Sequence, residues 1–469
     1  MTARIQPSWI MILLPLIALV FGGCGSSGGI NMTAETQEAT DSAEQSTADT
    51  AFSARAGAKA AKVNIPNSGD VLVIGGANAS KASTGKADIF DSTKKKFLAT
   101  GKLPKGRLGF GDPIISPDGS PETVLISGGL SGKARRSGSQ LRITFSLFAD
   151  GQLYSLGTGS FSKAAGDMAN PRAFHTATRL NDGSVLVAGG LDAQKNPITS
   201  AEIYDPGTGL YTATGSLNSA RAFHTATLLA DGKVLVVGGI NSSSFITLDT
   251  AEIYDPIAKT FALVAGKLTT PVAGHTTTRL SDNRVLITGG FSGYFLTVLS
   301  TEKSAIIYDP ATQEFVQTST NLTEERAFHT ATLLDNGKVL ISGGLRGQAG
   351  IFQGILNGIV GGIRNTAELF DPTTGNFSCI NGTTATASCA ASMTNSRAGH
   401  AATRIATGPL AGQVLLTGGA GAPKATTRGR GAPLASSELY NPAGGVDGSF
   451  SKTGKMKSAR VFHSAISMP

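Results

Sequence analysis

Apolar residues gather into short runs along most of this 469-residue chain, and the runs end repeatedly at a pair of glycines. The stretch Val234–Val237, followed by Gly238-Gly239, shows the pattern. Short apolar runs bounded by turn residues are typical of β-strands, whereas helices show a longer apolar periodicity. We therefore expect an all-β fold from about Asp70 to the C-terminus.

The glycine pairs recur seven times, which is the signature of a repeat protein. Each unit is interpreted as four strands: a short Thr-Ala-Thr strand, the aliphatic run, a Glu-Ile-Tyr strand and a strand with one aromatic residue. Asp-Gly or Asn-Gly joins the first two strands, and such pairs favour two-residue hairpins because both residues tolerate positive φ. The glycine pairs are Gly75-Gly76, Gly128-Gly129, Gly189-Gly190, Gly238-Gly239, Gly289-Gly290, Gly343-Gly344 and Gly418-Gly419.

This unit resembles the kelch repeat in the order of its glycine pair, its aromatic-Asp pair and its fourth-strand aromatic. The resemblance implies a seven-bladed β-propeller of kelch repeats, with one blade per unit. Kelch units usually carry Trp on the fourth strand, but the only Trp here is Trp9. The aromatics at that position are instead Tyr211, Phe261, Phe315, Phe377 and Phe450.

The two ends of the repeat region predict how the ring closes. The first unit begins at its second strand, residues 70–74, and the chain ends just after a first strand, residues 460–467. We expect the C-terminal strand to complete blade one, although residues 61–66 could also supply that strand. The second unit is degenerate: it has Arg107 but no histidine, and residues 147–150 stand where others have Ile-Tyr-Asp-Pro.

All six histidines belong to one recurring phrase of the Arg-Ala-Phe-His type. A residue that recurs once per repeat is first a scaffold residue, so we predict that each histidine binds the adjacent blade. The alternative is a ring of imidazoles and arginines in the central channel, able to hold a metal or an anion. The histidines are His175, His224, His275, His329, His400 and His463.

The N-terminal segment predicts the location of the protein. Arg4 is followed by an apolar stretch over residues 10–21, too short to span a membrane. Small residues directly before Cys24 resemble the bacterial lipobox, which implies lipid attachment to Cys24; plain secretion is the alternative. We expect a lipoprotein signal peptide over 1–23, a flexible tether over 24–62 and the propeller over 63–469. The protein would be lipid-anchored in the bacterial cell envelope, at the outer membrane, facing either the periplasm or the surface.

Cys379 and Cys389 remain after this processing. In an oxidising compartment two cysteines ten residues apart are expected to form a disulfide. A metal-binding pair is the weaker alternative.

Positive charge gathers in the loops between the second and third strands, which contain thirteen Lys and Arg but only three acids. A positively charged face attracts anions, so these loops are a candidate binding surface. The alternative is that the Lys and Arg residues only keep the loops soluble. The apolar, glycine-spaced loop over residues 350–363 could plug the channel mouth, dock a partner, touch lipid or pack onto blade six. The candidate ligand-binding residues are Arg135, Arg136, Arg346, Arg364, Lys424, Arg428 and Arg430.

The motifs of common hydrolases, nucleotide-binding proteins and zinc sites are missing from the chain. Kelch-type copper-radical oxidases need a Tyr–Cys cross-link with further Tyr and His ligands, a pattern we do not find. We therefore expect no metal, no cofactor and no catalytic activity. The predicted function is a monomeric, non-catalytic binding module for an anionic polysaccharide or an envelope protein, with no natural nucleic-acid ligand. The alternative is a carbohydrate-active enzyme of the mutarotase-like kelch type, which an acid and a base at the channel mouth would favour.

Overall fold

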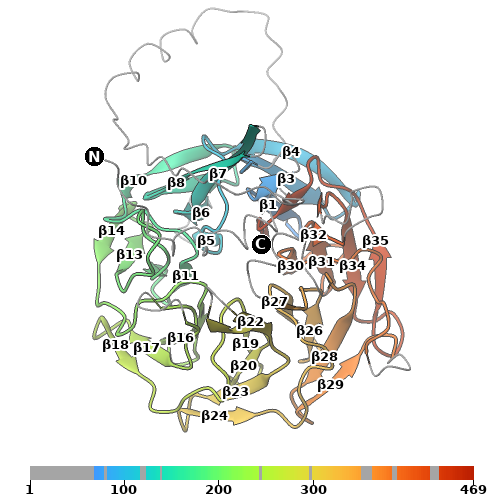
Figure 1. The fold of residues 1–469 in the computed structure, drawn as a ribbon. Coiled ribbons are helices and arrows are strands. Elements are labelled where there is room, and N and C mark those ends of the chain that lie inside the picture. The colour runs from blue at the N-terminus through green and yellow to red at the C-terminus, as the bar shows by residue number, and fades with distance from the viewer. Residues whose placement is uncertain are drawn as a thin grey trace, which may run out of the picture.

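The computed structural model describes residues 68–78, 82–116, 123–137, 140–241, 246–294, 298–349, 362–382, 388–422 and 432–468. Its strands form seven four-stranded antiparallel sheets. Figure 1 shows these sheets as blades around a common axis, with the first strand of each blade innermost. The predicted all-β, seven-bladed propeller is confirmed. Within the described ranges no helix is long and apolar enough to cross a membrane.

The C-terminal strand closes blade one, as predicted. Strand β37 (Ser464–Ser467) pairs with β1 (Val71–Ile74), which is followed outward by β3 (Lys86–Asp91) and β4 (Lys96–Lys102). The ring is thus held shut by hydrogen bonds between the two ends of the repeat region. Residues 61–66, the other candidate for this strand, lie outside the described residues.

The remaining blades follow one another along the chain, each from the innermost strand outward. Their bounds are β5 (Ile114–Ser116), β6 (Thr123–Ser127), β9 (Asp150–Ser155) and β10 (Phe161–Asp167) for blade two; β11 (Thr176–Arg179), β12 (Val185–Ala188), β13 (Ala201–Asp205) and β14 (Leu210–Ala213) for blade three; β15 (Thr225–Leu228), β16 (Val234–Val237), β17 (Ala251–Asp255) and β18 (Thr260–Leu263) for blade four; β19 (Thr276–Arg279), β20 (Val285–Thr288), β23 (Ala305–Asp309) and β24 (Glu314–Gln317) for blade five; β25 (Thr330–Leu333), β26 (Val339–Ser342), β28 (Ala367–Asp371) and β29 (Asn376–Cys379) for blade six; and β30 (Ala401–Arg404), β31 (Val414–Thr417), β34 (Ser437–Asn441) and β35 (Ser449–Lys452) for blade seven.

Short additional strands lie outside the blades. The longest are β7 (Leu130–Ser137) and β8 (Gln140–Leu147), which pair as a hairpin between the second and third strands of blade two. The others are β2 (Ala77–Asn78) with β36 (Arg460–Val461), β21 (Phe291–Tyr294) with β22 (Val298–Thr301) and β27 (Gln348–Ala349), and β32 (Ala420–Gly421) with β33 (Ala432–Pro433).

Each blade packs its second strand at the centre of the core. In β16 all four residues are buried, whereas the innermost strand β15 is only half-buried. Further out, an aromatic residue of the third strand contacts one of the fourth in every blade. The pair Tyr254 and Phe261 has its ring centroids 4.8 Å apart, so Phe or Tyr fills the position where a kelch unit usually has Trp.

The predicted third strand of blade two is wrong. We expected residues 147–150 to stand where other units have Ile-Tyr-Asp-Pro, but Val124 of the second strand pairs with Tyr154. In blade three the equivalent pair is Val185 and Tyr204. The third strand of blade two therefore lies at β9, and residues up to Leu147 belong to the extra hairpin instead.

Candidate functional site

In most blades a buried ion pair joins the segment before the inner strand to the third strand. In blade four, Arg221 Nη2 lies 2.6 Å from Glu252 Oε1, and both side chains are fully buried. Arg221 Nη1 also donates to the carbonyl oxygen of Gly238 at 2.8 Å. The equivalent pairs are Arg172–Glu202, Arg326–Glu368, Arg397–Glu438 and Arg460–Asp88, while Arg107 of blade two pairs with Asp150. These arginines are therefore part of the scaffold and do not form a ring for anions on the axis.

Sequence reasoning missed these pairs, although both partners recur once per unit. Blade five indicates most clearly that the arginine and the glutamate are partners. There Val272 replaces the arginine and Ile306 replaces the glutamate. Both side chains are buried in the same apolar cluster. The two replacements occur together, as expected for residues in contact.

The six histidines lie between neighbouring blades. His275 is buried, and its Nε2 lies 2.9 Å from Oγ1 of Thr225 in the preceding blade. Burial lowers the pKa of His275 to about 3, so the imidazole is neutral. The other five histidines make equivalent contacts: His175 with Ser127, His224 with Thr176, His329 with Thr276, His400 with Thr330 and His463 with Thr417. Their place in the structure is that of blade-to-blade connectors.

The residue before each histidine forms a second ring close to the axis. Phe174, Phe223, Phe328 and Phe462 occupy it in four blades, with φ between 52° and 56°, and Gly274 and Gly399 occupy it before the other two histidines. In blade two, which has no histidine, Gly109 before Phe110 takes the same place. Backbone N–H groups link successive members of this ring, since Phe223 N donates to Phe174 O at 3.2 Å. The rings of Phe174 and Phe223 stack at 4.4 Å. The half-buried phenylalanines make the surroundings of the axis aromatic.

Blade two breaks the histidine pattern. Phe110 follows Arg107 by three residues, the spacing of Arg172 and His175, and so stands in the histidine position. Phe110 also packs against the second glycine of its unit as the histidines do. A Cβ built on Gly129 would lie 3.0 Å from Phe110 Cβ, and one built on Gly190 of blade three would lie 2.8 Å from His175 Cβ.

Just before the inner strand, blade two has one residue more between Phe110 and Ile114 than blade three has between His175 and Thr178. In blade three, Leu186 of the second strand pairs with Thr178, which is the third residue after His175. The equivalent Leu125 of blade two lies opposite Ile114, the fourth residue after Phe110. An added residue in one strand is a β-bulge, which redirects a side chain and is frequent beside active sites. The bulge includes Asp112.

Asp112 is the carboxylate that this bulge presents. The preceding Gly111 keeps the inter-blade contact, because its N–H donates to His175 Nε2 at 3.2 Å. Solvent reaches the Asp112 side chain, yet desolvation by the surrounding protein raises its pKa. The carboxyl group is thus open to solvent and still partly desolvated by the protein around it. No described residue forms an ion pair with it, so the group is a candidate acid or base. In the sequence, the only indication of this site was that the second repeat unit departs from the others and lacks their histidine.

The basic residues predicted to bind a ligand are only partly described. Exposed Arg346 pairs with Glu325, Nε to Oε1, at 2.5 Å, and Arg364 Nη1 lies 3.6 Å from Glu324 Oε1. Desolvation lowers the pKa of Arg364, and the nearby charge of Arg346 acts in the same direction. The structure thus brings these two arginines together, each with an acidic neighbour. Arg135 and Arg136 lie on β7 without described side chains, and Lys424, Arg428, Arg430 and residues 350–361 lie outside the described residues.

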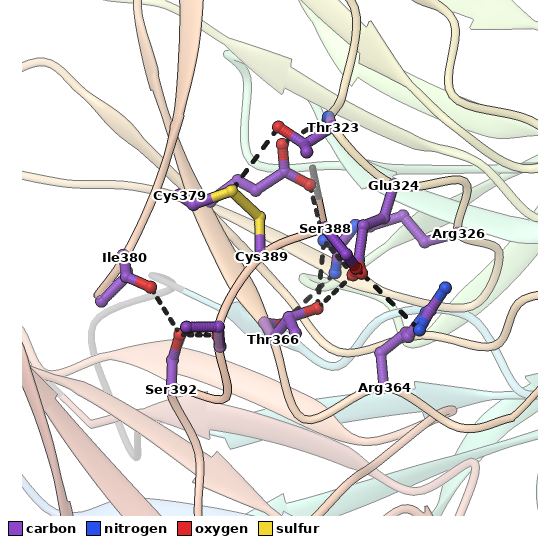
Figure 2. The surroundings of a disulfide bond; sticks show 12 residues. Thr323, Glu324, Arg326, Arg364, Thr366, Cys379, Ile380, Ser388, Cys389 and Ser392 are labelled. Carbon is purple, nitrogen blue, oxygen red and sulfur yellow. Dashed lines mark hydrogen bonds and ion pairs between the residues drawn. A yellow bond between two sulfur atoms is a disulfide. The ribbon is translucent and has the colours of Figure 1, made fainter. Parts of the chain in front are cut away.

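The two late cysteines form a disulfide beside this cluster. The Sγ atoms of Cys379 and Cys389 are 1.97 Å apart, and Figure 2 shows the hydroxyls of Ser388 and Thr366 converging on Glu324. Desolvation opposes ionisation of Glu324, but these two hydrogen bonds and the nearby arginines lower its pKa. The disulfide loop therefore helps to hold Glu324 as an anion. Cys24 and the predicted tether lie outside the described residues.

Comparison with known proteins shows a likeness of fold. No family model matches the chain, and no curated protein matches it. Among solved structures it is similar to a fungal alcohol oxidase of the AA5 family, in complex with copper, with a TM-score of 0.53 and 16% sequence identity. The likeness covers 78% of this chain and 71% of the oxidase chain.

The expectation that the protein is not an enzyme is contradicted by the likeness to a propeller that is an enzyme; at 16% identity that likeness itself shows the shared fold alone. The described residues nevertheless do not fit a copper centre. The Nε2 atom of each histidine makes a contact across a blade boundary, and the only described group of possible metal ligands is Glu368 with Cys379 and Cys389. Those two sulfurs are bonded to each other, so we derive no step through copper.

Proposed function

We propose that this protein is a carbohydrate-active enzyme of the kelch type that interconverts the anomers of reducing sugars, with Asp112 as its catalytic acid and base. The observation that carries the proposal is the carboxyl of Asp112, which lies in the bulge just before the innermost strand of blade two and is accessible to solvent. The likeness to a propeller enzyme supports a catalytic role for the fold.

Mutarotation suits a single carboxyl group. The protonated oxygen of Asp112 gives its proton to the ring oxygen of the sugar, while the other oxygen takes the proton of the anomeric hydroxyl. The C1–O5 bond breaks and the C1 carbonyl forms, and the carboxyl ends with its proton on the opposite oxygen. Reversal after rotation about the C1–C2 bond gives the other anomer. No oxidant, metal or cofactor is needed, and the carboxyl remains neutral throughout.

The surroundings of Asp112 favour this chemistry. Desolvation raises the pKa of its carboxyl and so increases the fraction in the protonated form that starts the reaction. The phenylalanines close to the axis, such as the stacked Phe174 and Phe223, offer apolar surface against which the C–H face of a sugar can pack.

The test is exchange NMR between the α and β anomers of glucose, galactose, N-acetylglucosamine and glucuronic acid. We expect the wild-type protein to accelerate exchange of at least one sugar and Asp112→Asn to reduce that rate by about 10²–10⁴-fold, the usual contribution of a positioned acid or base. Asp231→Asn is the matched control, since Asp231 lies in an exposed hairpin turn and Asn retains its Oδ1 acceptor. A wild-type protein that accelerates none of the four sugars, or an Asp112→Asn variant as active as the control, would refute the proposal.

The substrate and location follow from the predicted charge and N-terminus. The basic loop residues attract an anionic sugar or polysaccharide of the envelope, and a lipid on Cys24 holds the protein there. Binding of the protein to anionic polysaccharide should weaken as salt rises and should weaken further in Lys424/Arg428/Arg430→Glu. Cys24→Ala should move the protein from the membrane fraction to the soluble fraction. Unchanged distribution would remove the anchor from the proposal without affecting Asp112.

A further inference from the structure

A groove lies over blade three, where the loop between the second and third strands meets the segments that precede Arg172 and Arg221. Its volume is about 560 Å³, within the range of small-molecule sites. The lining residues are Asn170, Pro171, Asp192, Ala193, Gln194, Pro197, Ile198, Thr199, Ser200 and Ala220. The groove is distinct from the bulge that contains Asp112, which belongs to blade two.

The framework of the groove is tied to the buried core. Arg172 donates to the carbonyl oxygen of Ser200 at 2.8 Å and to its hydroxyl at 3.1 Å. Ile198 N donates to Gly190 O at 3.0 Å, and Arg221 N donates to Ile198 O at 3.3 Å. These contacts hold one wall in place before any ligand arrives, which reduces the entropy lost on binding.

The tip of the loop is fixed around Asp192. Its Oδ1 accepts the backbone N–H of Asn196 at 2.8 Å, and Lys195 N donates to the Asp192 carbonyl at 2.8 Å. A carboxylate has about four lone-pair positions, so this one retains acceptor capacity toward the groove. The side chain of Lys195 is close enough for its charge to oppose that of Asp192.

The lining alternates hydrogen-bonding groups with flat apolar surface. A carboxylate, two carboxamides and two hydroxyls come from Asp192, Asn170, Gln194, Thr199 and Ser200. The rings of Pro171 and Pro197 and the side chain of Ile198 supply the apolar part. A sugar ring presents the matching surface, since its hydroxyls lie at the edge and its C–H groups on the face.

We propose that this groove is a binding site for an uncharged sugar residue, separate from Asp112. It gives the protein a second, non-catalytic contact with a glycan. Because the groove is lined by a carboxylate and by no Lys or Arg, it disfavours anionic sugars, in contrast to the basic loops. The inference rests on the proposed action on carbohydrates, but it is tested by binding alone.

The experiment is isothermal titration of the protein with maltotriose, cellotriose and chitotriose. We expect wild type to bind at least one of them and Asp192→Asn to bind it about tenfold more weakly, since a hydrogen bond to a charged acceptor is lost. Asn keeps the Oδ1 acceptor for Asn196, so the loop retains its fold. Ala193→Trp, at an exposed position, should fill the groove and abolish binding without removing a native contact.

Two controls separate this site from the rest of the molecule. Asp249→Asn changes an acid in the equivalent loop of blade four, where it pairs with Lys267 at 3.1 Å, and should bind as wild type does. Asp112→Asn should also bind normally even when its activity is lost, so the groove and the proposed reaction fail independently. The proposal is overturned if wild type binds none of the three sugars at millimolar concentration, or if both Asp192→Asn and Ala193→Trp bind with wild-type affinity.

Discussion

Replacing Arg221 by valine should destabilise the propeller more than replacing both Arg221 and its partner. The guanidinium of Arg221 meets Glu252 at 2.6 Å with both side chains at 0% exposure. The single change leaves a carboxylate buried without its counter-charge, whereas Arg221→Val with Glu252→Ile removes both charges. Blade five already contains this apolar combination.

The contacts of Arg221 and Glu252 determine how much stability each variant should lose. Loss of one partner of a buried pair costs about 3–5 kcal/mol. Backbone N–H groups of Asn218 and Ser219 still donate to Glu252, at 2.7 and 3.0 Å, so we place the single variant near the lower end, at about 3 kcal/mol. The double variant loses these hydrogen bonds but buries no charge, and should cost about 1–2 kcal/mol.

Urea unfolding followed by circular dichroism measures both variants, because the only Trp is Trp9 in the predicted signal peptide and cannot report on the fold. The expected order of unfolding midpoints is wild type, then the double variant, then Arg221→Val. If the double variant is as unstable as Arg221→Val or less stable, the ion pair is worth more than an apolar contact at this position and the reasoning from blade five fails.

Three further predictions concern the scaffold. Replacing Cys379 and Cys389 by serine should lower the free energy of unfolding by about 2–3 kcal/mol, and in urea unfolding the reduced wild type should match that variant. Gly238→Ala should cost more than about 2 kcal/mol, because its φ is +60° and a Cβ would lie 2.3 Å from a carbonyl oxygen of the next blade; Gly157→Ala, in open space, should be nearly neutral by the same assay. Because burial lowers the pKa of His275 from 6.5 to about 3, its contribution to stability is complete above pH 6.5 and falls as the pH drops toward 3. The loss is about 2 kcal/mol by pH 5, and thermal unfolding of His275→Gln should show a correspondingly weaker pH dependence between pH 6.5 and 5.

The fold was predictable because the strand pattern repeats. Glycine pairs, two-residue hairpin turns and the unpaired C-terminal strand determined the number of blades and the closure of blade one through β37. The prediction failed for the third strand of blade two. There the hairpin β7–β8 inserts apolar residues that resemble a strand of the repeat, and only the pairing of Val124 with Tyr154 identifies the true one.

The candidate site was harder to predict because its geometry depends on register. Asp112 has no motif around it, and it lies in a segment that is one residue longer than its equivalent in blade three, which only the strand register reveals. The groove of blade three brings together Asn170, Asp192 and Ala220, which are separated in sequence and meet only when neighbouring blades pack. The basic residues were visible from composition, yet the described ones, Arg346 and Arg364, already have acidic neighbours.

A residue that departs from the repeat pattern can be interpreted by asking whether a second substitution nearby restores its packing or charge pairing. In blade five the loss of the arginine is matched by the loss of the glutamate, and Val272 and Ile306 are buried in one apolar cluster. That change preserves packing and needs no functional explanation. In blade two the histidine is replaced by Phe110, but the added Asp112 gains no partner among the described residues and bears a desolvated carboxyl. A change that costs free energy and is not offset by packing is expected at a functional site, which is why we assign the chemistry to blade two.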